Sequence, residues 1–428
     1  MWGFELNPYD SCVANKMIDG HQCTILWHVD DLKISHVDPA VVTDIIKLLE
    51  SEFGNEAPLT ITRGKKHDYL GMQIDFNDEG KVKFTMIDYI KGMLDELPED
   101  MSGMAPNPAG AKLFDVDIMA AGLPKETADI FHHNTAKLLF LCKRARPDIQ
   151  TAVAFLCTRV KAPDVDDYKK LRRVMQYLRA TVYMPLTLEA DDVSIVKWWA
   201  DASFAVHPDM KSHTGGVMTL GKGAIYGTST RQKINTKSST EAELVGVNDI
   251  MPQVLWTRYF LEAQGYTVEE SIIYQDNKST ILLAENGKAS SSRRTRHINI
   301  RYFFVKDRIA SGEMTVQYCP TDKMIADYFT KPLQGALFLK MRNEIMNVNP
   351  DDTDYGREDC RSVLNITEWT GGHDDGQTEG WTIVGPKKTK RKMSHGSENT
   401  PSDRNEQTRK TVVSCKIDTE RTRMDDLD

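Results

Sequence analysis

The chain lacks any run of about 18 apolar residues, the length that a membrane-spanning helix needs. Its N-terminus, MWGFELNPYD, also lacks the basic start and the apolar stretch of a secretory signal. We therefore expect an intracellular protein with no membrane partner. The sequence leaves open whether it resides in a cytoplasmic particle or in the nucleus.

Cysteine is scarce: the seven cysteines are scattered, and no C-x-x-C pair occurs among them. An odd, scattered set argues against a disulfide framework and against a zinc site. The formal net charge of −8 gives no bulk attraction to nucleic acid, so such a partner would be held by local basic patches and metal ions. A length of 428 residues with 40% hydrophobic content allows two or three globular domains.

The N-terminal part of the sequence predicts two β-hairpins and one helix. The segment HQCTILWHVDDLKIS places apolar β-formers on both sides of Asp30 and Asp31, which predicts a hairpin with two carboxylates at its tip. Pro39 and Gly54 bracket a segment with apolar residues at helical spacing. A second hairpin is expected around the turn at 77–80.

Helices are expected in the middle of the chain. Residues 98–128 are rich in Pro, Gly and Ala with weak periodicity, which predicts a connecting segment. Residues 133–160 have helical spacing around a break at Pro147, and 164–181 form an amphipathic pattern with an Asp at its start. Together they predict a helical linker region.

The pattern changes again from residue 193. Three strand-like runs, a long helix at 239–264, the short strand SIIYQ and a helix to about Ala284 give the order βββαβα, a mixed α/β plan. Beyond about residue 350 the polar composition predicts disorder. The basic run KKTKRK in that tail is either a nuclear-import or nucleic-acid patch or an ordinary solvated run.

Three carboxylates stand where strand ends and a helix start can converge. Asp201 ends the run VKWWA, Glu243 lies one turn into the long helix, and Asp276 ends SIIYQ. Taken singly, each would be an ordinary turn former or solvated acid. Packed together they would repel one another strongly unless a cation bound among them. Hard oxygen ligands of this kind can hold two Mg²⁺ ions about 4 Å apart, which activate water and neutralise charge in phosphodiester hydrolysis.

The short sequence motifs around these acids resemble those of the RNase H domain of Ty1/copia-type retrotransposon polyproteins. They are, in order, WWADASFA, STRQKINTKSSTEAELVGV, YQDNKSTI, RRTRHINIRYFFVKD and MIADYFTKPL. The resemblance implies that Asp201, Glu243 and Asp276 are catalytic metal ligands, with Asp327 as the fourth. It also implies two Mg²⁺ ions, with Mn²⁺ as the alternative ion, and an RNA–DNA hybrid as substrate.

Glu241 is the alternative to Glu243. The acid that is followed by Leu and small apolar residues matches the family's helix position, which favours Glu243. On a helix the two residues point about 200° apart, so both cannot face the metals.

Small polar and basic side chains are expected to bind the hybrid. Such a nuclease must sense a 2′-hydroxyl in the minor groove and hold the phosphates beside it, which suits hydroxyl, amide and guanidinium groups. The candidates are Ser238, Ser239, Asn277, Arg293, Arg294 and Arg296. His297 either assists product release or proton transfer, or is a capping or packing histidine, and we leave it out of the catalytic set.

WHVDDLKI resembles the reverse transcriptase palm hairpin, with His28 where Tyr is usual. GFELNPYDSCVANK, DYLGMQIDF, RPDIQTAVAFL and YKKLRRVMQYLRAT also resemble copia-type polymerase segments, so the likeness covers about 1–346. We expect weak metal binding at most at Asp30 and Asp31. A polymerase also needs a third carboxylate on an earlier strand and closing fingers, so we expect no DNA synthesis by this chain alone.

The expected fold class is mixed α/β. We expect a partial reverse transcriptase palm at 1–97, a linker and helical thumb or connection region at 98–185, an RNase H-like domain at 186–346 and a disordered tail at 347–428. The chain would be a C-terminal piece of a Pol polyprotein or a truncated genomic copy, with other Pol segments as partners. The expected activity is an RNase H-type endoribonuclease. The alternatives are an inactive remnant, a domesticated nucleic-acid-binding protein, and an integrase or transposase relative, which would need a late catalytic Glu in place of Asp327.

Overall fold

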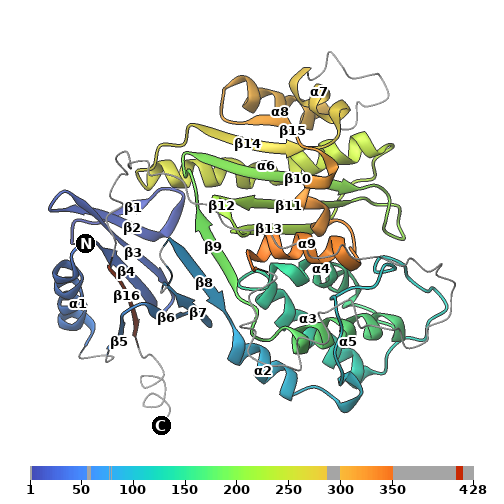
Figure 1. The fold of residues 1–428 in the computed structure, drawn as a ribbon, viewed down its shortest axis with the longest axis horizontal. Helices are drawn as coiled ribbons and strands as arrows, with labels where there is room; N and C mark the ends of the chain where they lie inside the picture. The colour runs from blue at the N-terminus through green and yellow to red at the C-terminus, as the bar shows by residue number, and fades with distance from the viewer. Residues whose placement is uncertain are drawn as a thin grey trace, which may run out of the picture.

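The computed structural model describes residues 2–54, 59–76, 78, 80–286, 299–349 and 411–417. These residues form three β-sheets with helices packed against them, so the mixed α/β class is confirmed. Figure 1 shows the N-terminal sheet on one side, a group of helices below, and the sheet of β10, β11, β13, β14 and β15 above them. Within the described residues, no helix is long and apolar enough to cross a membrane.

The N-terminal sheet has the strand order β1-β2-β3-β4-β16-β5. Its strands are β1 (Glu5–Asn7), β2 (Asp10–Ile18), β3 (His21–His28), β4 (Asp31–His36), β5 (Leu59–Arg63) and β16 (Thr411–Ile417). β3 and β4 form the predicted hairpin, with His28 opposite Asp31. Helix α1 (Pro39–Phe53) begins at its proline, and its apolar side packs on the strands.

A second sheet joins the N-terminal part to the rest of the chain. Its order is β12-β9-β8-β7-β6. The strands are β6 (Lys66–Tyr69), β7 (Met72–Asp75), β8 (Lys81–Thr85), β9 (Leu186–Ala190) and β12 (Gly221–Lys222). β7 and β8 form the second predicted hairpin. The pairing of β8 with β9 connects segments that the helices separate along the chain.

The next helices lie between β8 and β9 in the sequence. They are α2 (Ile87–Asp95), α3 (Lys125–Cys142), α4 (Gln150–Arg159) and α5 (Val165–Ala180), with the short turn η2 (Pro147–Ile149) at the predicted break. α3 begins at Lys125, eight residues before the sequence suggested, because Pro124 precedes it as its N-cap residue. Asp164 caps α5 in a capping box with Asp167.

The third sheet carries the residues of the candidate site. It has the order β13-β11-β10-β14-β15: β10 (Ile195–Ser203), β11 (His213–Thr219) and β13 (Tyr226–Arg231) are antiparallel, and β14 (Glu270–Gln275) and β15 (Thr315–Tyr318) run parallel to β10. Helix α6 (Ser239–Ala263) packs on one face. Helices α7 (Lys278–Asn286) and α8 (Asn299–Ala310) follow β14. The predicted βββαβα order is therefore present.

The other face of this sheet shares a core with the helices. Apolar side chains of α3, α4 and α5 pack with those of β11, of the turn η6 (Ile325–Phe329) and of α9 (Gly335–Met346). A buried ion pair lies within the helical region: Arg146 donates to both carboxylate oxygens of Asp148, at 2.8 and 2.7 Å. Tyr328 of η6 donates to the carbonyl of Asp148 at 2.9 Å. The helical region thereby fixes the segment that carries Asp327.

The predicted tail differs from the structure at one segment. Thr411–Ile417 forms strand β16, which pairs with β4 on one side and with β5 on the other. Its β-branched residues in the run TVVSCKI suit a strand, and its partners lie at the far end of the sequence. The remaining parts of the tail, 350–410 and 418–428, lie outside the described residues.

Candidate active site

Three carboxylates from three different elements meet at one end of the third sheet. Asp201 lies near the end of β10, Glu243 lies in the second turn of α6, and Asp276 directly follows β14. Each offers an oxygen, and these oxygens all lie within 4.8 Å of one another. Among the described residues, this is the one group of three or more acids, histidines or cysteines close enough to share a metal ion.

The site is electrostatically costly without a cation. Asp201 and Glu243 are buried, whereas Asp276 is half-buried. Burial, and then the negative charges of Asp201 and Asp276, raise the pKa of Glu243 well above its usual range. Gln275 donates from Nε2 to Glu243 at 3.2 Å, which opposes that shift but does not cancel it. A divalent cation would relieve this repulsion, so the donor set fits Mg²⁺ or Mn²⁺.

Asp327 lies beside Asp201, and both contact Lys331. Burial, and then the negative charge of Asp201, raise the pKa of Asp327 to about 7. The Lys331 ammonium lies 2.7 Å from Asp327 Oδ1 and 3.3 Å from Asp201 Oδ2. Thr330 donates to Asp201 Oδ2. The structure therefore places Asp327 next to the three-carboxylate group but not within it.

Gly215 allows η6 to approach the sheet at this point. It pairs directly with Asp201 across β10 and β11. A Cβ atom at Gly215 would lie 2.6 Å from Thr330 Cγ2 and 2.9 Å from the carbonyl oxygen of Ala326. Any side chain here would push η6 away, so this glycine sets the distance between Asp201 and the segment of Asp327.

The geometry separates Glu241 from Glu243. The Glu241 carboxylate accepts a hydrogen bond from the backbone N–H of Lys237 at 2.7 Å, and its own N–H donates to Ser238 Oγ at 3.2 Å. This is a helix-capping arrangement at the start of α6. Only Glu243 joins the group with Asp201 and Asp276.

The residues expected to bind a hybrid lie in several places. Ser238 is the N-cap residue of α6, Ser239 is exposed in its first turn, and Asn277 accepts hydrogen bonds from the N–H groups of Ser279 and Thr280 at the start of α7. Both helix starts flank the carboxylate group. The segment with Arg293, Arg294, Arg296 and His297 lies outside the described residues.

Asp30 and Asp31 lie away from this group, at the tip of the β3–β4 hairpin. Among the described residues, they belong to no set of three metal-ligating side chains. Val29 at this tip has a φ of 54°, which is rare for a β-branched residue. The hairpin is therefore a tight turn that carries two carboxylates.

Sequence reasoning missed Thr330, which donates to Asp201, and three further residues that touch the acids. Lys331 pairs with Asp201 and Asp327, Gln275 donates to Glu243, and Thr321 donates to Asp276 Oδ2 at 2.9 Å. Lys331 follows Asp327 by four positions within MIADYFTKPL, and Gln275 directly precedes Asp276. These positions close to Asp327 and Asp276 in the sequence were the signal by which Lys331 and Gln275 could have been found.

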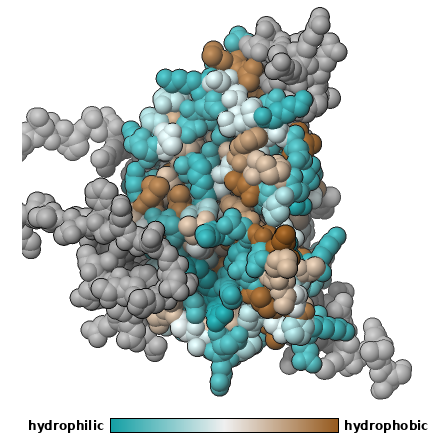
Figure 2. Space-filling model, turned by 90° about the vertical axis from the view of Figure 1, so that its right-hand side faces the viewer, coloured by the Kyte–Doolittle hydropathy of each residue, from teal (hydrophilic) through white to brown (hydrophobic). Residues whose placement is uncertain are grey.

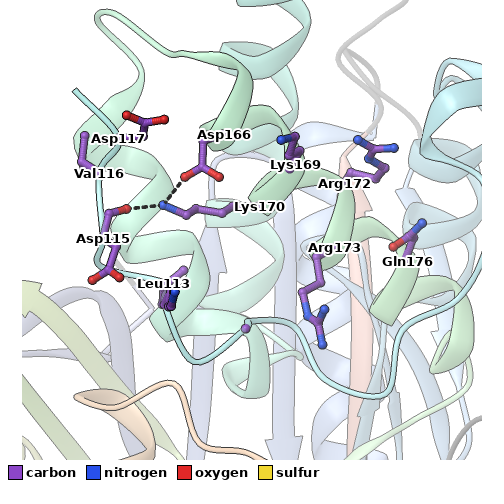
Figure 3. A pocket seen from close by; sticks show the side chains of 12 residues that line it. Leu113, Asp115, Val116, Asp117, Asp166, Lys169, Lys170, Arg172, Arg173 and Gln176 are labelled. Atoms are coloured by element: carbon purple, nitrogen blue, oxygen red, sulfur yellow. Dashed lines mark hydrogen bonds and ion pairs between the residues drawn. The ribbon is translucent and has the colours of Figure 1, made fainter. Parts of the chain in front are cut away.

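A basic hollow lies on α5, beside the connecting segment at 110–117. It has a volume of about 580 Å³ and is lined by five basic and three acidic side chains: Lys112, Lys169, Lys170, Arg172, Arg173, Asp115, Asp117 and Asp166. Figure 3 shows Lys170 held between Asp115 and Asp166. Phe114 of the same segment packs on His207 and His213, with ring centroids 5.1 Å apart in both cases. The segment that lines the hollow therefore also contacts His213 of β11, the strand that pairs with β10.

Known proteins similar to this chain are Pol polyproteins of transposons. The Pol polyprotein of transposon TNT 1-94 from Nicotiana tabacum is 26% identical, over 75% of this chain and 24% of its own length. That of transposon RE1 from Arabidopsis thaliana is 27% identical, over 75% and 21%. The truncated Ty1-A Gag-Pol polyprotein of Saccharomyces cerevisiae is 23% identical, over 76% and 28%. The chain thus spans about a quarter of the length of these relatives, and no protein-family profile matches it.

Similar solved structures include LC11-RNase H1, isolated from compost, with a TM-score of 0.25 and 11% identity over 32% of this chain and 92% of that chain. Another is the foamy viral protease-reverse transcriptase in complex with an RNA/DNA hybrid, with a TM-score of 0.38 and 11% identity over 65% and 34%. The homologues of this chain are therefore retrotransposon Pol polyproteins of the Ty1/copia type.

Proposed function

We propose that this chain is a divalent-metal-dependent RNase H-type nuclease that hydrolyses the RNA strand of RNA–DNA hybrids. The observation that carries the proposal is the convergence of Asp201, Glu243 and Asp276, whose oxygens lie within 4.8 Å of one another. Burial of two of these acids and the raised pKa of Glu243 indicate a site that a cation stabilises. The likeness to Pol polyproteins supports a nucleic-acid-processing enzyme.

Asp201, Glu243 and Asp276 would hold the metal, with Asp327 beside them. Bound there, Mg²⁺ would activate a water and neutralise charge on the phosphoryl group. Gln275 orients Glu243 through its hydrogen bond, and it is held in turn by the carbonyl of Ala200 at 3.2 Å. Thr321 orients Asp276 in the same way. These bonds limit the rotamers of the two acids, which keeps their oxygens aimed at one point.

The substrate class follows from the residues around the acids. Ser239 is exposed at the start of α6, and Asn277 lies at the start of α7, so polar groups stand on both sides of the carboxylates. Helix starts and small polar groups suit phosphates and a 2′-hydroxyl. Figure 2, which views the molecule from the right-hand side of Figure 1, shows a mostly hydrophilic surface with separate hydrophobic patches.

The test uses the full chain, because α3, α4 and α5 share a core with the third sheet. A labelled RNA–DNA hybrid is incubated with the chain and Mg²⁺, and the RNA products are resolved. We expect cleavage of the RNA strand that stops in EDTA, and a loss of at least about 100-fold in the Asp201→Asn and Glu243→Gln variants. The matched control is Glu241→Gln, which keeps the capping acceptor and should cut within a few-fold of wild type.

Two outcomes would contradict this assignment. Either the wild-type chain leaves the hybrid intact at every Mg²⁺ and Mn²⁺ concentration tested, or the Asp201→Asn and Glu243→Gln variants cut as well as wild type. Isothermal titration with Mg²⁺ alone reports on metal binding separately. Loss of that binding in Glu243→Gln but not in Glu241→Gln would place the metal at the proposed ligands.

A second candidate function is hybrid binding without cleavage. The observation that favours it is Lys331, whose ammonium already lies between Asp201 and Asp327 and supplies part of the positive charge that a metal would bring. A chain of this kind would bind the hybrid with equal affinity in EDTA and in Mg²⁺, and would leave it uncut. Fluorescence anisotropy beside the cleavage assay separates the two functions.

We also propose that the chain does not extend primers by itself. In the described part of the chain, Asp30 and Asp31 belong to no group of three metal-ligating side chains whose ligand atoms lie within 4.8 Å of one another, and two-metal chemistry requires a larger ligand set. Primer extension on a primed RNA template, with the full chain and deoxynucleotides, is the test. Any template-dependent extension that Asp30→Asn or Asp31→Asn abolishes would show that this proposal is wrong.

A further inference from the structure

Strand β16 occupies an interior position in the N-terminal sheet. It runs antiparallel to β4, from Lys416 opposite Asp31 to Thr411 opposite His36. It also runs antiparallel to β5, from Ile417 opposite Leu59 to Val413 opposite Arg63. Figure 1 shows it among the N-terminal strands, although it is the last strand in the sequence. The sheet is thus completed by a segment from the other end of the chain.

Without β16, two strand edges would lose their partners. Among the described residues, β5 pairs with β16 and with no other strand, and β4 has β3 on its other side only. Unpaired N–H and C=O groups along an edge are costly when buried, and they attract other strands when exposed. The space between β4 and β5 therefore presents backbone donors and acceptors on both sides, spaced for one antiparallel strand.

The register agrees with the residue pattern of β16. Apolar residues occupy alternate positions, at Val413, Cys415 and Ile417. The residues opposite these positions on the two neighbouring strands include members of the core beneath α1: Ile34, Leu32, Ile61 and Leu59. A shift of one residue would set Ser414 and Lys416 opposite that core instead. The apolar alternation in the sequence and the backbone pairing therefore select the same register.

The link to the rest of the chain does not impose this position. Residues 350–410 separate α9 from β16, and a segment of that length spans up to about 200 Å when fully extended. A tether this long raises the local concentration of the strand without fixing its register. Recognition must therefore come from pairing with β4 and β5.

We propose that the gap between β4 and β5 is a strand-binding site, and that its ligand is the C-terminal segment Thr411–Ile417 of the same chain. Binding is by β-augmentation on both edges, and the site selects an extended peptide with apolar residues at alternate positions. Another strand can pair with β4, next to Asp31, only after β16 leaves. This inference is independent of the carboxylate site.

Disulfide trapping tests the register and the source of the strand. Leu32→Cys introduces a thiol at the residue that pairs with the native Cys415 in the ladder, and directly paired antiparallel residues have Cα atoms about 4.5–5.5 Å apart, a separation that a disulfide can span. The matched control is Lys33→Cys, one position away and opposite Ser414. After mild oxidation, peptide mapping should find the 32–415 link within one chain and no 33–415 link. Equal yields in both variants, no link at all, or a link between two chains would each overturn the proposal.

A second measurement, hydrogen exchange, tests the proposal without oxidation, in case the disulfide variants disturb the sheet. Ser414→Pro in the full chain removes an N–H group from an interior strand. We expect amide hydrogen exchange at Ile34 and Ile61 to accelerate at least about tenfold, and a synthetic peptide of residues 408–420 to restore protection. Exchange in α6, which lies on another sheet, should not change. Unchanged exchange at Ile34 and Ile61, or no rescue by the peptide, contradicts the proposal.

Discussion

The Lys331 ammonium lies 3.3 Å from the Asp201 carboxylate, so an acid of the proposed metal site already has a cation of the chain beside it. The same ammonium lies 2.7 Å from Asp327. Lys331 keeps 41% of its side chain exposed, which leaves it room to move aside. Lys331 therefore compensates part of the acidic charge in the metal-free chain and would compete with a metal for Asp201.

Replacing Lys331 tests this competition. In Lys331→Met, Asp201 and Asp327 lose their internal counter-charge, so we expect the chain in EDTA to lose about 1–3 kcal/mol of stability. Mg²⁺ should restore most of that loss and should bind more tightly than in wild type. Thermal denaturation with and without Mg²⁺ measures both effects. Lys323→Met, at an exposed lysine of the same segment, should change neither; an equal effect there would remove the special role of Lys331.

The raised pKa of Glu243 predicts how the stability of the metal-free chain depends on pH. Its pKa in the folded chain is raised well above the unfolded value of 4.5, so between these values the folded state binds more protons than the unfolded state. Metal-free stability should therefore fall as the pH rises above 4.5. Each pKa unit corresponds to about 1.4 kcal/mol, so Glu243→Gln in EDTA at pH 8 should be more stable than wild type by about 1 kcal/mol or more. Urea denaturation from pH 5 to 8 measures the slope.

The control for that experiment is Mg²⁺ itself. A bound cation removes the repulsion between Glu243, Asp201 and Asp276, so saturating Mg²⁺ should flatten the pH slope of the wild type. The Glu243→Gln slope should respond to Mg²⁺ far less. If Glu243→Gln is less stable than wild type in EDTA at pH 8, the acid is not a source of repulsion in this fold.

A buried histidine pair should make the stability of the chain change with pH in the opposite direction from Glu243. His207 and His213 are joined by a ring-nitrogen contact of 2.9 Å, and His213 also contacts Ser229 Oγ at 2.7 Å. Burial lowers the pKa of His207 to about 4 and that of His213 to about 3. The unfolded chain takes up these protons near pH 6.5, so their contribution is fully present above pH 6.5 and is lost as the pH falls towards 4.

Substituting one of these histidines tests whether the pair causes the predicted loss of stability as the pH falls. In His207→Gln, one proton uptake by the unfolded chain disappears, so stability between pH 6.5 and 4 should fall less steeply than in wild type. The comparison is made in Mg²⁺, where Glu243 contributes little. The exposed His133 on α3 supplies the control variant His133→Gln, whose slope should match wild type. An unchanged slope in His207→Gln would show that the pair does not titrate as described.

Local sequence signals predicted the elements that depend on neighbours in the chain. Pro39 and Gly54 bound helix α1, and the β3–β4 hairpin follows from apolar runs on both sides of Asp30 and Asp31. Asp201, Glu243 and Asp276 could be proposed together because strand ends and a helix start converge in this order of elements. The helix and the hairpin need only short-range pattern, whereas the set of acids also needed the resemblance of the surrounding motifs to the Ty1/copia-type RNase H domain.

Local sequence signals could not predict contacts between residues that lie far apart in the sequence. The run TVVSCKI has the composition of a strand, but its partners β4 and β5 lie at the opposite end of the sequence, and no local pattern identifies them. The ion pairs of Lys331 depend on how closely η6 approaches β10, which Gly215 permits. Both features arise from tertiary packing rather than from periodicity.

The basic hollow on α5 gives a prediction for binding that is separate from cleavage. Lys169 is exposed in it, and Arg172 donates only a long hydrogen bond of 3.4 Å to the carbonyl of Asp100, so both can contact phosphates. Phosphate contacts release counterions, and each one lost should lower the slope of log affinity against log salt by about 1.

We expect Lys169→Ala and Arg172→Ala to weaken hybrid binding and to reduce that slope, while Lys125→Ala, at an exposed lysine outside the hollow, leaves both unchanged. Anisotropy titrations of a non-cleaved hybrid in Ca²⁺ between 50 and 200 mM salt, roughly the range where such slopes are large, provide the measurement. If all three variants behave alike, the hybrid does not reach α5, and the polar groups at the starts of α6 and α7 must hold it alone.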